Sequence, residues 1–373
     1  MTETELIAFF EDLHAHPELG FEEVRTTEKV KAVLDKAGIP YVIPGTPTGL
    51  IAIFKGKKPG KIIALRADMD ALPVTEETGR PYASTVPGKM HACGHDFHTA
   101  CMLAAALELK AREEEIAGEI RVIFQPSEEI CNGAQAVIAS GLLDDVDEFY
   151  AGHTYPFFPA GTLGIKDGPI MAAPDAFRIT ITGRGAHAGN PHLGIDPIPV
   201  ACALVLQAQT IVSRFKDAFE PAVLSITHIT SGNTWNVVPE TAFIEGTLRT
   251  MHEDTRKVMH ERLAHMAENI AAASECTAKV EWTDGSPALE NDQALAAKAR
   301  EVATELGFTL GVQGNTMGGE DFSEYLRKAP GVFVRVGTGG NIANHHPKFT
   351  ADPKALAPAA HYFAELALRR ARS

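Results

Sequence analysis

Short apolar runs alternate with segments of helical periodicity at both ends of this chain, and this alternation restricts the fold more than any other feature. The apolar runs lie at residues 50–54, 62–65, 120–124, 149–152 and 332–336. The helical patterns lie at residues 3–14, 26–37, 102–111, 133–140, 294–306 and 354–370. Strands that are apolar on both faces and joined through helices form parallel sheets covered by helices. The two ends therefore predict an α/β fold with a mostly parallel, buried sheet.

The middle of the chain follows a different pattern. Phe177, Ile179 and Ile181 alternate with polar residues, which is typical of a strand with one wet face. Asp196 and Pro197 then begin a helix that runs to about residue 215. Strands follow at 223–229 and 242–248, a second helix opens at 254, and a last strand lies at 278–282. The order βαββαβ predicts a ferredoxin-like α+β unit.

The length of 373 residues suits two domains, or one large domain with an insertion. We expect residues 1–174 and 286–373 to form one metal-binding catalytic domain, with residues 175–285 inserted into it. Three separate domains are the alternative. Insertion is favoured because residues able to bind metal lie on both sides of the middle segment.

The charge and the cysteines exclude some classes of function. The net charge of -14 disfavours nucleic-acid binding, which needs a basic surface to displace counterions. Residues 1–5 are acidic and unlike a signal peptide, and no apolar segment is long enough to cross a bilayer. The five cysteines are scattered and odd in number, which fits a reducing compartment better than a disulfide framework. We therefore expect a cytoplasmic protein that binds neither nucleic acid nor membrane.

Residues 90–100 concentrate three histidines, a cysteine and an aspartate just before a helical pattern. Cys93 and His95 are two residues apart, so in extended chain their side chains point to the same side. A thiolate and an imidazole that converge in this way suit a first-row metal ion, and Gly94 between them leaves room for it. The alternative is a buried cysteine beside surface histidines, because a free cysteine behaves as a small apolar residue.

Metal-capable residues also follow four of the predicted strands. In open parallel sheets, ligands bind beyond the carboxyl ends of the strands. Each group alone has an ordinary structural explanation, such as a solvated turn for paired glutamates or a turn cap for an aspartate. Together they predict a metal site. The groups are Arg66, Asp68 and Asp70; Glu128 and Glu129; His153; and His345 and His346.

The adjacent Glu128 and Glu129 can divide two tasks. One carboxylate can bind a metal ion while the other takes a proton from water. A bound divalent metal lowers the pKa of water to about 7, and a well-placed general base adds about 10²- to 10⁴-fold to the rate. Asp70 is a candidate to orient a ligand histidine through a hydrogen bond.

The motifs at residues 66–73, 91–98, 125–129, 187–189, 236–239, 318–322 and 345–349 together resemble one family. The chain resembles metal-dependent amidohydrolases of peptidase family M20. More narrowly, it is similar to the branch that holds bacterial aminoacylases, hippurate hydrolases and plant auxin-conjugate hydrolases. The resemblance covers nearly the whole chain and implies a zinc-peptidase-like catalytic domain. It also implies that the inserted domain is a lid and a dimerisation surface, so that the protein forms a homodimer or a higher homo-oligomer.

The resemblance implies a role for each candidate residue. Two divalent ions, such as zinc, manganese, cobalt or nickel, would be bound, with the thiolate in a bridging or shared position. Glu128 would be the general base, and His187, supplied by the partner subunit in this family, would stabilise the oxyanion. The choice between His345 and His346 stays open. The implied metal ligands are Cys93, His95, Glu129, His153 and His345.

The expected reaction is hydrolysis of an N-acyl amino acid, with an acetyl, benzoyl or similar acyl group. Asn236 and Arg249 are candidates to bind the substrate carboxylate, for which an arginine offers a bidentate fork. Either residue can instead have a structural role, Asn236 in its own turn and Arg249 as a solvated charge. The alternatives for the whole protein are a dipeptidase or carboxypeptidase, and a non-catalytic metal- or ligand-binding protein on the same scaffold. A free base beside a ligand argues against the last, because structural metal sites have no need of one.

Overall fold

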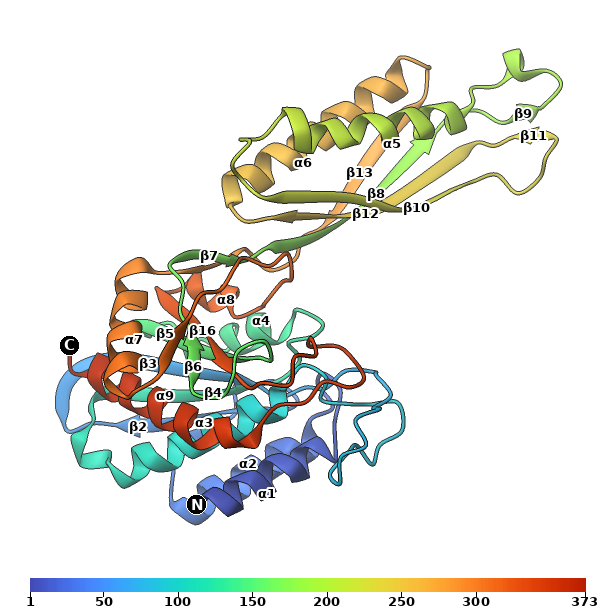
Figure 1. Ribbon diagram of the computed structural model, residues 1–373. Coiled ribbons are helices and arrows are strands. Elements are labelled where there is room, and N and C mark those ends of the chain that lie inside the picture. The colour runs from blue at the N-terminus through green and yellow to red at the C-terminus, as the bar shows by residue number, and fades with distance from the viewer. The chain divides into compact units, whose positions relative to one another are not determined.

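The computed structural model describes all residues 1–373, and the chain divides into two compact units (Figure 1). Unit 1 comprises Met1–Gly168, Glu290–Gly314 and Asp321–Ser373. Unit 2 comprises Pro169–Leu289 and Asn315–Glu320. The sequence pattern had assigned residues 315–320 to the catalytic domain, whereas here they are grouped with the inserted unit. Two short strands, β7 (Gly168–Met171) and β14 (Leu289–Asn291), lie where the chain passes between the units.

Unit 1 is built on an eight-stranded sheet in the order β1-β2-β4-β3-β5-β16-β6-β15. The pairs β1–β2, β2–β4 and β16–β6 are antiparallel, and the other four are parallel. The predicted α/β class is therefore confirmed, as a mixed sheet that is mostly parallel. In sheet order, the strands are Tyr41–Val42, Leu50–Lys55, Ala117–Gln125, Lys58–Asp68, Glu148–Tyr155, Gly331–Gly337, Thr162–Gly164 and Thr309–Gly311.

Helices cover both faces of this sheet (Figure 1). On one face, Leu65 and Val334 pack in a continuous core with Leu103 and Phe363 of the covering helices. On the other face, Phe333 packs against α8, with its ring 5.8 Å from that of Phe322. The first face carries α1 (Glu3–His14), α2 (Val24–Ala37), α3 (His95–Ala111), α7 (Gln293–Glu305) and α9 (Leu356–Ala371), and the second carries α4 (Gly133–Ile138) and α8 (Ser323–Leu326). Two short 3₁₀ turns, η1 (Glu113–Glu115) and η3 (Pro353–Ala355), complete the unit.

The helix predicted at residues 102–111 begins much earlier, at His95. Its first turn is polar and lies at the carboxyl edge of the sheet, so apolar periodicity did not reveal it. Gly94 precedes it with φ +89°, in the left-handed region that favours glycine. A Cβ there would lie 2.7 Å from Thr154 Oγ1. The expectation of extended chain between Cys93 and His95 was therefore wrong, because a left-handed glycine turn joins them instead.

The strand expected at residues 149–152 is also longer than predicted. β5 continues to Tyr155, so His153 lies within the strand rather than after it. His153 is paired in register with Arg335 of β16. The imidazole is thus carried by one of the central strands of the sheet, which is a rigid support for a ligand.

Unit 2 contains the predicted ferredoxin-like arrangement. Its four-stranded antiparallel sheet has the order β10-β12-β8-β13, with both helices packed on it. Asp196 caps the first helix by accepting from the Ile198 amide, and Pro197 occupies its first position, as expected. The elements are β8 (Ala173–Thr182), α5 (Pro197–Arg214), β10 (Ala222–Ser231), β12 (Thr241–Thr250), α6 (Glu253–Ala272) and β13 (Thr277–Thr283). A small ribbon of β9 (Ala186–His187) and β11 (Val237–Val238), with η2 (Pro191–Leu193), completes the unit.

Candidate metal centre

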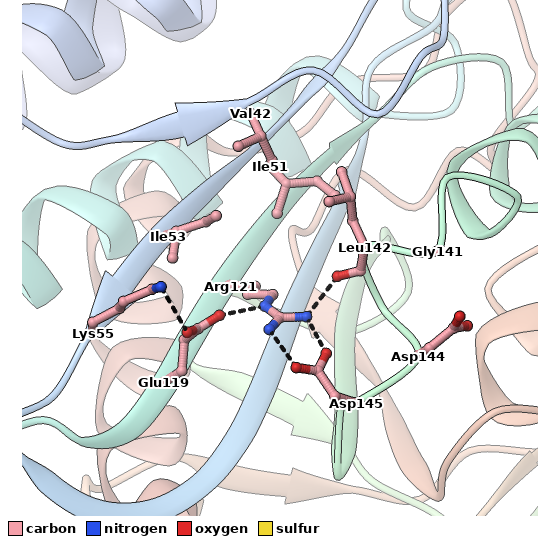
Figure 2. Close-up of a pocket in the computed structure, with 10 residues that line it drawn as sticks. All are labelled: Val42, Ile51, Ile53, Lys55, Glu119, Arg121, Gly141, Leu142, Asp144 and Asp145. Atoms are coloured by element: carbon pink, nitrogen blue, oxygen red, sulfur yellow. Dashed lines mark hydrogen bonds and ion pairs between the residues drawn. The ribbon is translucent and has the colours of Figure 1, made fainter.

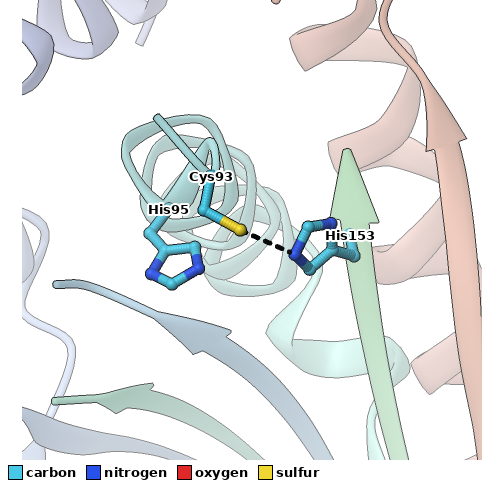
Figure 3. Close-up of side chains that lie close together, drawn as sticks. All are labelled: Cys93, His95 and His153. Atoms are coloured by element: carbon cyan, nitrogen blue, oxygen red, sulfur yellow. Dashed lines mark hydrogen bonds between the residues drawn. The ribbon is translucent and has the colours of Figure 1, made fainter. Parts of the chain in front are cut away.

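Five side chains with metal-binding chemistry meet at the carboxyl edge of the unit 1 sheet. They form two groups of three, Cys93 with His95 and His153, and Cys93 with Glu129 and His345. Within each group, the ligand atoms lie within 4.8 Å of one another. Figure 3 shows the sulfur of Cys93 pointing toward the His153 ring, whose Nε2 is 3.4 Å away. The structure thus brings together all five residues that the sequence proposed as ligands, with Cys93 common to both groups.

Two atoms of these groups test whether a metal ion fits. His95 Nε2 and Glu129 Oε1 are buried, lack a hydrogen-bond partner, and lie 3.8 Å apart. A buried polar atom without a partner costs about 1–3 kcal/mol. Thiolate, imidazole and carboxylate are ligands that first-row divalent metals accept. The residues therefore fit a divalent cation, which would satisfy both atoms.

The shifted pKa values of His95 and His153, both buried, also fit a bound cation. Burial alone would lower the pKa of His95, but Asp68, Asp70 and Glu129 outweigh burial and raise it to about 10. Burial and the neighbouring His98 hold the pKa of His153 well below its usual range. His153 is therefore in the neutral form that a ligand needs. The carboxylates that favour the protonated form of His95 would equally attract a divalent cation in place of the proton.

Asp70 connects the ligand His95 with the adjacent glutamates Glu128 and Glu129. Its Oδ1 is 3.2 Å from His95 Nδ1, so it orients that ring. The backbone amides of Glu128 and Glu129 each donate to one of its oxygens at 3.0 Å. One buried carboxylate therefore positions a ligand histidine and the glutamate pair together. This is the geometry that a ligand-orienting aspartate requires.

A buried network that the sequence analysis did not assign lies beneath the ligands. Asp68 accepts from His98 Nδ1 and from Arg66 at 2.6 Å each, and Arg66 also donates to Asp321 at 2.6 Å. His98 Nε2 accepts from the Thr154 amide at 2.8 Å, which fixes the tautomer of the His98 ring. This bond also holds the backbone next to His153.

The sequence carried one signal of this buried network, which is an arginine at the end of an apolar strand. A buried charge needs buried partners.

The structure distinguishes the two adjacent histidines of the last motif. His345 Nε2 lies 3.5 Å from Glu129 Oε1, within the second group of ligands. Its backbone has φ +68° and its amide donates to the Ala92 carbonyl at 2.7 Å. His346 instead accepts from the Lys348 amide through Nδ1 at 3.0 Å, so its ring belongs to its own turn.

His187, Asn236 and Arg249 all lie in unit 2. His187 is on β9, and Asn236 immediately precedes β11, whose Val237 pairs with His187. His187 Nδ1 accepts from the Gly189 amide at 3.0 Å, so a neutral ring would carry its proton on Nε2, where it can act as a donor. Arg249, on β12, donates to Thr247 Oγ1 at 3.1 Å. The ribbon brings His187 and Asn236 near each other, and the roles of all three residues stay predictions.

A second polar region of unit 1 is a cleft of about 570 Å³ between β1, β2, β4 and residues 141–145 (Figure 2). Arg121 lies at its centre and is fully engaged. It donates to Glu119 at 2.5 Å, to the Leu142 carbonyl at 2.5 Å, and to both oxygens of Asp145 at 2.6 and 3.0 Å. None of the lining residues has a buried polar atom without a partner. The cleft therefore has the character of a structural ion-pair cluster.

No helix in the structure combines the length and the apolar character needed to span a membrane.

Comparison with known proteins gives matches along nearly the whole chain. A sequence model of peptidase family M20/M25/M40 matches residues 64–369. The N-acetylcysteine deacetylase of Bacillus subtilis is 45% identical over 366 residues, covering 98% of this chain and 96% of that protein. Thermostable carboxypeptidase 1 of Saccharolobus solfataricus is 36% identical over 366 residues, covering 96% of this chain and 93% of that protein.

A solved structure agrees with these relatives. The crystal structure of a dinuclear metal-binding peptidase of family M20 from Bacillus subtilis has a TM-score of 0.90 at 42% identity. The match covers 98% of this chain and 97% of that chain. The fold, the buried cluster and the relatives therefore point to the same group of enzymes.

Proposed function

This chain belongs to peptidase family M20, and we propose that it is a metal-dependent amidohydrolase that hydrolyses N-acyl amino acids to a carboxylic acid and a free amino acid. The single observation that carries the proposal is the pair of ligand groups that share Cys93. Glu128 lies beside them, with Oε2 3.9 Å from His95 Nε2, and forms a further close group with His95 and Glu129. Because the family resemblance leaves Glu128 outside the ligand set, we assign its carboxylate to proton transfer. The site therefore combines five ligands with a neighbouring carboxylate suited to moving a proton.

We assign two divalent ions to the centre, held by the groups Cys93–His95–His153 and Cys93–Glu129–His345. Zinc, manganese, cobalt and nickel all suit this set of thiolate, imidazole and carboxylate donors. When bound, such ions act as Lewis acids on a carbonyl oxygen and lower the pKa of a water ligand to about 7. A dinuclear site in a similar solved structure supports this assignment.

Glu128 acts as the general base and then as the general acid. Its carboxylate takes a proton from the attacking water and returns it to the leaving amine nitrogen, so that the amine departs as a neutral group. Asp70 supports this role because it holds the amides of Glu128 and Glu129 and the ring of His95. Both catalytic and ligand groups are thus kept in one geometry without rearrangement.

The substrate-binding residues are proposed to come from unit 2. His187, with a donor Nε2, stabilises the oxyanion, and Arg249 and Asn236 bind the substrate carboxylate. We propose that unit 2 acts as the lid of the catalytic domain. Its exposed Trp235, Val237 and Leu193 lie on or near the β9–β11 ribbon and support its use as a contact surface.

Unit 2 is also proposed as the dimerisation surface. β10 is an edge strand of its sheet, and an edge strand offers free backbone groups to a second copy. On α5, the exposed Ile198, Cys202 and Leu206 form an apolar stripe at intervals of four residues. A Leu206→Glu substitution should shift the mass measured by light scattering toward that of the monomer. A cytoplasmic location is proposed as well, supported by five cysteines that are all free.

The experiment that tests the function is a substrate panel on the chelated and reconstituted protein. N-acetyl and N-benzoyl amino acids are offered beside dipeptides, with zinc, manganese, cobalt or nickel restored. We expect amino acid release from the N-acyl substrates, loss of release after chelation, and recovery with metal. Activity that survives exhaustive chelation would contradict the proposal.

A carboxypeptidase or dipeptidase is the second candidate function, favoured by the 36% identity to a thermostable carboxypeptidase. The same panel separates the two candidates, because a dipeptide carries a free amino group that needs its own binding partner. Preference for dipeptides by about tenfold in kcat/KM would favour the second candidate. Stoichiometric metal binding without hydrolysis of any amide would instead indicate a non-catalytic binding protein.

A further inference from the structure

We propose that Glu23, which no sequence motif singled out, is the positioning residue that holds Glu128 in place. The inference rests on the proposed function, in which Glu128 moves the proton. Glu23 lies at the start of α2 and is fully buried, more than 100 residues before the glutamate pair. The hydrogen bonds of its carboxylate are with Thr48 and the Ser127 amide, and not with the proposed ligands. The carboxylate contacts the turn that carries Glu128.

The turn between β4 and α4 is held by carboxylates at three successive amides. The Ser127 amide donates to Glu23 Oε1 at 2.8 Å. The next two amides, of Glu128 and Glu129, donate to Asp70 at 3.0 Å each. Glu23 and Asp70 therefore fix the backbone on both sides of the Glu128 side chain. Asp70 also orients the ligand His95, whereas Glu23 binds the turn and no ligand.

The backbone of this turn needs such support because it is strained. Ser127 has φ +60°, a left-handed conformation that residues with a Cβ adopt only at a cost. Cys131, at the other end of the turn, has φ +55°. Strained backbone persists where the surrounding structure over-determines it, and such positions gather at active sites. Within the turn, the Ser127 hydroxyl donates to Asn132 Oδ1 and its carbonyl accepts from the Gly133 amide. The bond from the Ser127 amide to Glu23 is the contact that ties this residue to a distant part of the chain.

Glu23 is itself fixed in position. Thr48 donates its hydroxyl hydrogen to Glu23 Oε2 at 2.6 Å, and the Thr27 hydroxyl donates to the Glu23 carbonyl at 2.7 Å. The chain just before α2 also packs closely on the turn, because a Cβ on Gly20 would lie 2.6 Å from Ser127 Oγ. The carboxylate is therefore a preorganised acceptor, and it cannot follow the turn if the turn moves.

A small displacement at Ser127 passes directly to Glu128, the next residue. A misplacement of about 1 Å in a catalytic group costs about 100-fold in rate. Removal of the Glu23 carboxylate should therefore lower kcat while leaving KM and metal binding near their wild-type values. A glutamine keeps an oxygen acceptor for the Ser127 amide, so it should preserve most of the rate.

The test compares four variants for kcat, KM, metal content and amide exchange. Glu23→Ala removes the acceptor, Glu23→Gln keeps it, and Thr48→Val removes the bond that fixes the carboxylate. Glu22→Ala is the matched control, because the neighbouring Glu22 is 61% exposed and pairs with Lys89 at the surface. Hydrogen–deuterium exchange of residues 125–132 is measured as a readout that does not depend on activity.

We expect kcat to fall about 100-fold in Glu23→Ala and about 5-fold in Thr48→Val, with KM within about 3-fold of wild type. Glu23→Gln should stay within about 3-fold in kcat, and Glu22→Ala should match wild type. The Ser127 amide should exchange about tenfold faster in Glu23→Ala than in Glu23→Gln. Metal content should be unchanged in all four variants.

Wild-type kcat and a protected Ser127 amide in Glu23→Ala would overturn the proposal. An equal loss of kcat in Glu23→Gln and Glu23→Ala would also overturn it, since the negative charge of Glu23, rather than its hydrogen bond to the turn, would then determine the rate. If Glu23→Ala fails to fold, the proposal is tested by kcat and amide exchange in Thr48→Val, which loses the bond that fixes the Glu23 carboxylate. If the wild type hydrolyses no amide, the proposed function fails, and the exchange of Ser127 in these variants still decides whether Glu23 holds the turn.

Discussion

Strand β4 leads from one cluster of charged residues to another, and the two clusters differ in how their charges are satisfied. Near its start, Arg121 in the cleft is matched by Glu119, Asp145 and a carbonyl (Figure 2). Beyond its far end, the metal centre leaves Glu129 Oε1 and the facing His95 Nε2 buried without partners. Similar residue types thus form an ion-pair cluster in which the charges are paired in one place, and a set of ligand atoms that lack partners in the other. Two facing ligand atoms that are buried without partners, an imidazole nitrogen and a carboxylate oxygen, mark the site where a cation belongs better than charge itself does.

The largest effect that tests this comparison is expected from Glu128→Gln. Glutamine keeps the shape of the side chain but cannot take a proton, so kcat should fall about 10²- to 10⁴-fold. Metal content measured by mass spectrometry should stay at the wild-type value, because the amides bound to Asp70 are unaffected. Turnover close to that of the wild type would remove Glu128 as the base.

The next effect concerns the residue shared by the two ligand groups. Cys93→Ala should lower the affinity for both ions and reduce bound metal below one ion per chain, whereas His153→Ala should affect one ion more than the other. Bound metal per chain is measured after dialysis against a defined free zinc concentration. An unchanged metal content in Cys93→Ala would show that the two groups do not share this ligand.

A smaller effect distinguishes the two adjacent histidines. His345→Ala should lower activity by at least about 10- to 100-fold, the loss typical of removing a residue that only orients a metal ligand. His346→Ala should stay within about twofold of wild type, because its ring is bound within its own turn. Steady-state assays with saturating metal measure both. A reversed order of the two variants would move the ligand to His346.

The smallest effect on catalysis is expected in the cleft. Arg121→Met should leave kcat and KM unchanged, but lower the free energy of unfolding by about 1–3 kcal/mol, because Glu119 loses its close partner. Urea denaturation measures the loss of stability. A fall in kcat of tenfold or more, with metal content retained, would mean that the cleft is more than a closed ion-pair cluster.

The sequence predicted the architecture better than the connections between distant segments. Apolar alternation and helical periodicity identified the α/β sheet and the ferredoxin-like unit, because those patterns are local. The first turn of α3 was missed, since His95 and Asp96 give no apolar stripe. Residues 315–320 are grouped with unit 2 through long-range contacts, which a local sequence pattern does not reveal.

The candidate site was predictable where several motifs converge and not where one residue acts alone. The proposed ligand set came from the resemblance to a known family, supported by metal-capable residues near predicted strand ends and before a helical pattern, and the structure brings these side chains together. Glu23 was missed because a glutamate in a polar segment looks like a surface residue, and only the fold buries it against Ser127. The ion pair of Arg66 with Asp321 was not predicted, because it joins segments 255 residues apart.

The position of β16 in the sheet has a consequence for the synthesis of the chain. It is the last strand to leave the ribosome, yet it lies between β5 and β6 in the order of the sheet. Domains generally fold as units during synthesis. The sheet of the first unit therefore keeps a gap at its middle until residue 337 has emerged, while every strand of the inserted ferredoxin-like unit is already available. A growing chain that has not reached residue 331 lacks both this strand and His345, so the sheet and the proposed metal centre are completed together, after both have emerged.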